Sequence, residues 1–115
     1  MKRTIKYDKL VRDNIPKIIE RYGGKVNYIR LEDPDEFKTA LKQKLIEEVN
    51  EFLHAKTDDE AIEELADILT VIETMNIMYG YRVKDRVRTK AQEKGLFNEK
   101  IFLESVEEEI TDVGV

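Results

Sequence analysis

The sequence is most constrained between residues 44 and 67, where two acidic pairs lie on either side of a short polar connection. Glu48 and Glu51 are three residues apart in the first pair. Glu64 and Asp67 have the same spacing in the second pair. On an α-helix, residues three apart project from one face, so each pair can grip one ion. The pattern therefore predicts two helices that each present a pair of carboxylates.

A tight turn joins these two predicted helices. Residues 54–56 form the connection, and Thr57 begins a Thr-x-x-Glu capping box. A connection this short predicts an antiparallel helical hairpin. Glu48 and Glu64 each lie eight residues from Lys56, so at about 1.5 Å per residue they stand level, roughly 12 Å from the turn. We therefore expect all four acids to converge.

Helical periodicity places the acids at the edge of the core rather than on open surface. In the first helix, Glu48 and Glu51 border an apolar arc. In the second helix, Glu64 falls inside the apolar stripe and Asp67 lies at its margin. Such a carboxylate is costly to ionise unless a cation or hydrogen bonds compensate its charge. A cluster of acids without thiol or imidazole partners suits a hard, oxygen-seeking ion, Mg²⁺ or Mn²⁺.

Composition excludes several other kinds of chemistry. The 115 residues include no cysteine and a single histidine, His54, which removes thiolate chemistry and a zinc site built from several histidines. A net charge of -5 argues against a stable nucleic-acid partner. No stretch approaches the ~18 apolar residues of a membrane span, and the first residues lack the apolar run of a signal peptide. We therefore expect a cytoplasmic protein without a membrane partner.

Helix start and stop signals outline the chain as one mainly α domain over residues 1–115. Pro16 lies in the first turn of a short helix, while Gly23 and Gly95 end two of the helices. Alternating residues predict a small two-stranded β element, and the acidic tail from about residue 107 is expected to be loose. Helices are expected after Asp13 or Asn14 and over 37–54, 58–79 and 83–94, and the strands at about 26–30 and 100–104.

Two helix faces are candidates for contact with a partner. The apolar stripe of the 58–79 helix is too wide for one neighbouring helix, so we expect a homodimer or homotetramer. Basic residues recur every four positions on the last helix, a pattern as consistent with phosphate binding as with solvated surface. This basic stripe consists of Arg82, Arg86, Lys90 and Lys94.

Charged residues make up 39% of the chain, so a single Glu-x-x-Glu is ordinarily explained as part of a solvated helix face. Lys44 and Glu48, at four-residue spacing, can form a simple ion pair. On that interpretation the chain is a non-catalytic helical interaction module whose acids keep it soluble. Two such pairs at matched distances from one turn favour a metal site instead.

The acidic motif also carries a family resemblance. Glu47-Glu48-x-x-Glu51, twelve intervening residues and Glu64-x-x-Asp67 resemble the metal-binding motif of the MazG-like all-α nucleoside triphosphate pyrophosphohydrolase superfamily. The segments KYDKLVRDNIPKII and KAQEKGLFNEKI resemble its small stand-alone branch, described as house-cleaning or phosphoribosyl-ATP pyrophosphohydrolase-like proteins. The resemblance covers about residues 6–103 and implies an antiparallel helical bundle of the all-α pyrophosphohydrolase type.

The resemblance implies Mg²⁺-dependent hydrolysis of a nucleoside triphosphate, including non-standard ones, between the α and β phosphates, which releases a monophosphate and pyrophosphate. Phosphoribosyl-ATP hydrolysis in histidine biosynthesis is the alternative within the same chemistry. By resemblance, the metal ligands are Glu48, Glu51, Glu64 and Asp67, and Glu47 and Glu48 are the catalytic acids. The substrate-binding candidates are Lys9, Arg12, Lys44, Lys90 and Lys94.

Overall fold

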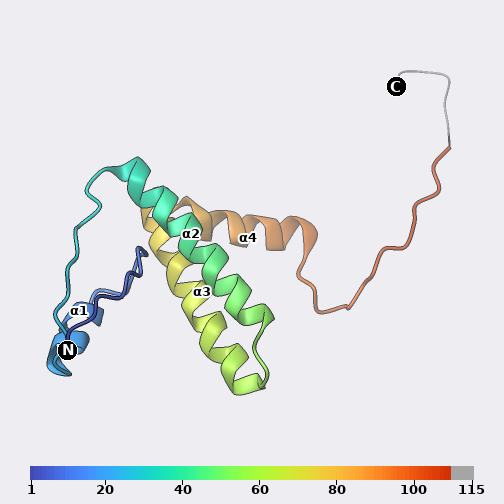
Figure 1. Ribbon diagram of the computed structural model, residues 1–115. Coiled ribbons are helices and arrows are strands. Elements are labelled where there is room, and N and C mark those ends of the chain that lie inside the picture. The colour runs from blue at the N-terminus through green and yellow to red at the C-terminus, as the bar shows by residue number, and fades with distance from the viewer. Residues whose placement is uncertain (110–115) are drawn as a thin grey trace. The chain divides into compact units, whose positions relative to one another are not determined.

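The computed structural model describes residues 1–109, and the regular structure within them is entirely helical (Figure 1). The predicted mainly α class is therefore confirmed. The last helix stops before Gly95, whose φ of 78° is a left-handed conformation that favours glycine. The helices in the described range are α1 (Ile15–Arg21), α2 (Pro34–Leu53), α3 (Asp58–Met78) and α4 (Arg82–Lys94).

The chain divides into two compact units, Met1–Arg82 and Val83–Val115. The first unit contains α1, α2 and α3, and the second contains α4 from Val83 onward. The single domain over residues 1–115 stays a prediction. Within residues 1–109, none of the helices has the length and the apolar composition of a membrane span.

Helices α2 and α3 pack against each other as an antiparallel hairpin (Figure 1). Side-chain caps fix where both helices begin. Asp33 accepts a hydrogen bond from the backbone N–H of Glu36 at 3.1 Å, and Pro34 follows it at the first helical position. Thr57 Oγ1 accepts one from the N–H of Glu60, also at 3.1 Å. These caps and the short turn between the helices hold α2 and α3 in register.

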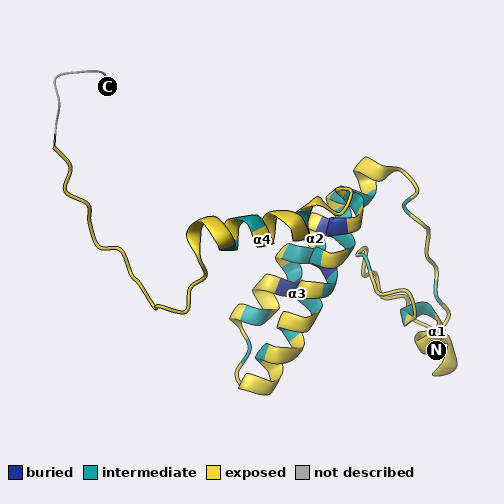
Figure 2. Cartoon of the chain, turned by 180° about the vertical axis from the view of Figure 1, so that it is seen from behind, coloured by how far each residue is buried: buried dark blue, intermediate teal, exposed yellow. Residues whose placement is uncertain are grey.

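Few residues of the hairpin are buried (Figure 2), and one of them is a glutamate. Leu41 and Val71 are the buried apolar residues of the described range, while Glu48 and Asn76 are each only 5% exposed. Leu41 and Glu48 lie seven residues apart on α2, about two helical turns, so they continue one buried row. A buried carboxylate lowers stability unless a partner compensates its charge. The position of Glu48 therefore indicates a role other than packing.

The predicted two-stranded β element is wrong, since no strand forms within residues 1–109. The segments 26–30 and 100–104 are both without helix or strand. Alternation over five residues stabilises a strand only where one face is buried, and Ile101 and Phe102 are largely exposed. Of the acidic tail predicted from about residue 107, only residues 107–109 are described, and the remainder lies outside the described residues.

One side of the hairpin carries exposed apolar side chains, which we call the apolar face. On each helix three of them follow the spacing i, i+3, i+7, so they form one stripe per helix. Their exposed fractions range from 38% to 71%. The members are Ile46, Val49 and Leu53 on α2 and Ile62, Leu65 and Leu69 on α3.

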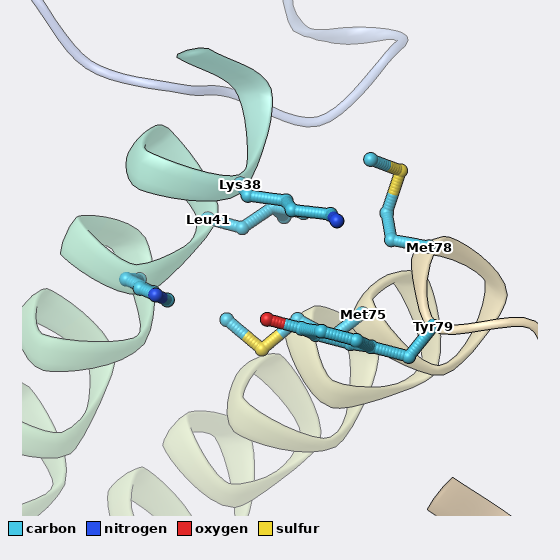
Figure 3. A pocket seen from close by; sticks show the side chains of 6 residues that line it. Lys38, Leu41, Met75, Met78 and Tyr79 are labelled. Carbon is cyan, nitrogen blue, oxygen red and sulfur yellow. The ribbon is translucent and has the colours of Figure 1, made fainter. Parts of the chain in front are cut away.

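A shallow pocket lies between the first half of α2 and the end of α3 (Figure 3). Its walls combine apolar and basic side chains, and the Lys38 ammonium stands 5.0 Å from the centroid of the Tyr79 ring, a cation–π distance. None of its lining residues is acidic. The pocket is therefore separate from the carboxylates of interest. It is lined by Lys38, Leu41, Lys42, Met75, Met78 and Tyr79.

Candidate metal centre

The hairpin brings three of the predicted acids together. Glu48 and Glu51 come from α2 and Glu64 from α3, and one carboxylate oxygen of each lies within 4.8 Å of the other two. The three side chains differ in burial: Glu48 is buried, Glu64 is half-buried and Glu51 is exposed. We call these residues the acidic cluster. It reaches from the core to the surface, so an ion bound there would keep access to water and to a ligand.

Two oxygens of the acidic cluster lack hydrogen-bond donors. Glu48 Oε1 lies 3.1 Å from the Lys44 ammonium, but the buried Glu48 Oε2 has no hydrogen-bond partner among the described residues. Glu64 Oε2 is likewise buried and without a partner in that range. A buried polar atom without a hydrogen-bond partner lowers the stability of the fold unless an ion or a water molecule binds to it. Either a cation or a proton on one of the two carboxyl groups would satisfy these oxygens.

The chemistry of the donor set agrees with a hard divalent cation. All three residues offer oxygen, which Mg²⁺ and Mn²⁺ prefer, and no sulfur or imidazole competes. Acidic clusters on open surface are common without an ion, but Glu48 is almost fully buried. The acidic cluster therefore fits a metal ion, with Glu48, Glu51 and Glu64 as its ligands.

Hydrogen bonding to Glu48, burial and the neighbouring Glu51 shift the proton equilibrium of Glu64. Its pKa is raised to about 7, first because the protonated carboxyl can hydrogen-bond to Glu48, and next because of burial and the neighbouring Glu51. Glu64 thus holds a proton for part of the time at neutral pH. A divalent cation replaces that proton, because it stabilises the ionised form of all three carboxylates.

Mg²⁺ binding should therefore weaken as the pH falls. The raised pKa of Glu64 means that protons compete with the metal below about pH 7, so we expect about tenfold lower affinity at pH 6 than at pH 8. Calorimetric titration at both pH values, in two buffers of different ionisation enthalpy, measures the affinity and the protons released. Glu63→Gln, an exposed neighbour on α3, should keep this dependence. Equal affinity at both pH values would contradict the assignment.

Basic side chains surround the cluster. The Lys9 ammonium donates to Glu47 Oε1 at 2.9 Å, and Lys44 reaches Glu47 Oε2 at 3.3 Å as well as Glu48. The hydrogen bond between Lys9 and Glu47 raises the pKa of Lys9 and lowers the pKa of Glu47. Glu47 is therefore ionised at neutral pH and is held beside the cluster by two ammonium groups.

Asp67, the fourth predicted ligand, does not join the cluster. Arg12 Nη2 donates to Asp67 Oδ1 at 2.6 Å and to Thr70 Oγ1 at 3.2 Å. Thr70 was not among the predicted residues, although its position three residues after Asp67 on α3 was the signal that could have identified it. Lys90 and Lys94 lie on α4, in the second unit of the chain. The structure thus brings Lys9, Arg12 and Lys44 to the acids of the hairpin.

Comparisons with known proteins assign no family. No family model matches the chain, and no solved structure matches it. Over 55 residues, which are 48% of this chain, it is 47% identical to an uncharacterized protein of Mycolicibacterium smegmatis. The chain spans 55% of the length of that relative. The resemblance to MazG-like pyrophosphohydrolases therefore stays a prediction that rests on the residues themselves.

Proposed function

We propose that the chain is a Mg²⁺-dependent nucleotide pyrophosphohydrolase that cleaves a nucleoside triphosphate to a monophosphate and pyrophosphate. The observation that carries the proposal is the buried Glu48 Oε2, which has no hydrogen-bond donor among residues 1–109 and belongs to a cluster of three carboxylates. Lys44 pairs with Glu48, and Lys9 and Arg12 pair with the nearby acids Glu47 and Asp67. Basic side chains at these positions suit a polyphosphate. A cytoplasmic house-cleaning role against non-standard nucleotides belongs to the same proposal.

In this proposal, different residues bind the metal ion and contact the substrate. Glu48, Glu51 and Glu64 would hold Mg²⁺, which when bound neutralises phosphate charge and lowers the pKa of a coordinated water. Glu47 stays ionised because of its hydrogen bond with Lys9, so it can accept a hydrogen bond from the attacking water and orient it. Lys44 lies between Glu47 and Glu48, within reach of a phosphate that approaches the metal.

A nucleotide panel tests this function. Purified chain is incubated with Mg²⁺ and standard or modified nucleoside triphosphates, or with phosphoribosyl-ATP, and pyrophosphate is measured. We expect Mg²⁺-dependent release from at least one nucleoside triphosphate, reduced roughly 100-fold or more in Glu64→Gln because a metal ligand is lost. Glu63→Gln, of the same type and on the same helix, should remain active.

The outcomes separate the alternatives. If pyrophosphate is released from phosphoribosyl-ATP and from no nucleoside triphosphate, the substrate is phosphoribosyl-ATP, as in histidine biosynthesis. No release from any substrate, with no Mg²⁺ binding, would favour the non-catalytic helical interaction module. Release that is unchanged in Glu64→Gln would place the chemistry elsewhere in the chain.

We also propose that a second copy of the chain covers the apolar face. Its six residues are 38% to 71% exposed. A second copy that covered them would bury apolar surface of the kind found in stable interfaces, to which each partner contributes about 800 Å². At about 100° per residue, Val49 lies opposite Glu47 on α2, and Leu65 lies opposite Asp67 on α3. Self-association through this face would therefore leave the acidic side of the hairpin open to substrate.

A further inference from the structure

Residues 1–14, which precede α1 and which we call the N-terminal arm, reach both helices of the hairpin. Lys9 pairs with Glu47 on α2 at 2.9 Å. Three residues later, Arg12 pairs with Asp67 on α3 at 2.6 Å. The arm therefore bridges the two helices at the side where the acidic cluster lies.

Ion pairs, rather than buried apolar side chains, attach the N-terminal arm to the hairpin. Leu10 is half-buried, and every other residue from 1 to 14 is exposed. The side chains of Lys9 and Arg12 are 39% and 54% exposed in their ion pairs, so water and salt weaken both contacts. Contacts of this kind are readily displaced by a stronger cation.

Asp67 is the residue for which Arg12 and a metal ion compete. Asp67 lies three residues after Glu64 and therefore on the same side of α3. Its Oδ1 accepts a short charge-assisted hydrogen bond from Arg12, and Asp67 is absent from the acidic cluster. A divalent cation beside Glu64 would attract the carboxylate of Asp67 and repel the guanidinium. The two cations cannot hold the same oxygen together.

We propose that the N-terminal arm is a cation-displaceable strap in which Arg12 holds Asp67 outside the metal shell until a divalent ion recruits it. The proposal rests on the metal centre of the proposed function. Recruitment of Asp67 frees the planar guanidinium of Arg12, whose paired N–H donors match a phosphate. Arg12 is thus a positioning residue that lowers metal affinity and becomes available to an anion only when the metal is bound.

Mn²⁺ affinity of the full chain and its variants tests the strap. We expect Arg12→Gln to bind Mn²⁺ roughly two- to fivefold more tightly, because an exposed ion pair of that strength no longer competes. Adding Asp67→Asn should abolish this gain, since the two residues act through one contact. Lys17→Gln, which removes a basic side chain of α1, should leave the affinity unchanged. Unchanged or weaker Mn²⁺ binding by Arg12→Gln would overturn the proposal.

Limited trypsin digestion gives a second readout that does not depend on activity. Release of Arg12 from Asp67 should speed cleavage after Arg12 severalfold when Mn²⁺ is added, and Glu64→Gln should show no such response. Slower cleavage with Mn²⁺ would overturn the proposal. If no variant binds Mn²⁺, the metal centre and the strap both fail. If Mn²⁺ binds the unmodified chain and is lost in Glu48→Gln, while Arg12→Gln changes nothing, only the strap fails.

Discussion

Glu48→Gln should remove divalent-metal binding while leaving the helical hairpin folded. The amide keeps the volume of the side chain and an oxygen that Lys44 can bind, but it offers no negative charge to a cation. We expect Mn²⁺ affinity to fall by roughly 100-fold or more, as measured by electron paramagnetic resonance of free Mn²⁺. Pyrophosphate release should fall with it, because Glu48 is the most deeply buried of the proposed ligands.

Without metal, the same variant should be at least as stable as the unmodified chain. Substitution removes a buried carboxylate and its repulsion of Glu51 and Glu64, so the thermal midpoint at neutral pH should stay constant or rise. Glu63→Gln, at an exposed position on α3, should change neither binding nor the midpoint. Tight Mn²⁺ binding by Glu48→Gln would remove the acidic cluster as the site. A collapse of the midpoint would make Glu48 a structural residue.

Local chemistry made the helices and much of the cluster predictable. Thr57 and Gly95 mark helix ends through their own side chain or backbone, so the sequence locates them without tertiary information. The register of Glu48 against Glu64 follows from equal distances to one short turn, and the structure places both in the acidic cluster. The helix predicted over 37–54 begins at Pro34 in the structure, because Asp33 caps it and proline is well accommodated in the first turn.

Contacts between distant residues were not predictable in the same way. Asp67 was expected to join the other acids, but its partner Arg12 lies 55 residues earlier and is brought to it by the path of the arm. The two predicted strands failed for a related reason. Alternation within residues 100–104 is a local signal, whereas a strand depends on pairing and on a buried face that the local sequence does not supply.

Leu69→Glu should disrupt self-association through the apolar face. Leu69 is 60% exposed in the single chain and lies within the stripe on α3, so a second copy would bury the new carboxylate without a partner. We expect light scattering at micromolar concentration to give an oligomer for the unmodified chain and a monomer for the variant.

Ile77→Glu is the matched control, because Ile77 is 57% exposed on the same helix but lies about 80° from Leu69, outside the stripe. A monomeric unmodified chain, or equal masses for both variants, would contradict the proposed interface. Loss of association in Leu69→Glu alone would show that the hairpin completes its small core with a second copy of itself.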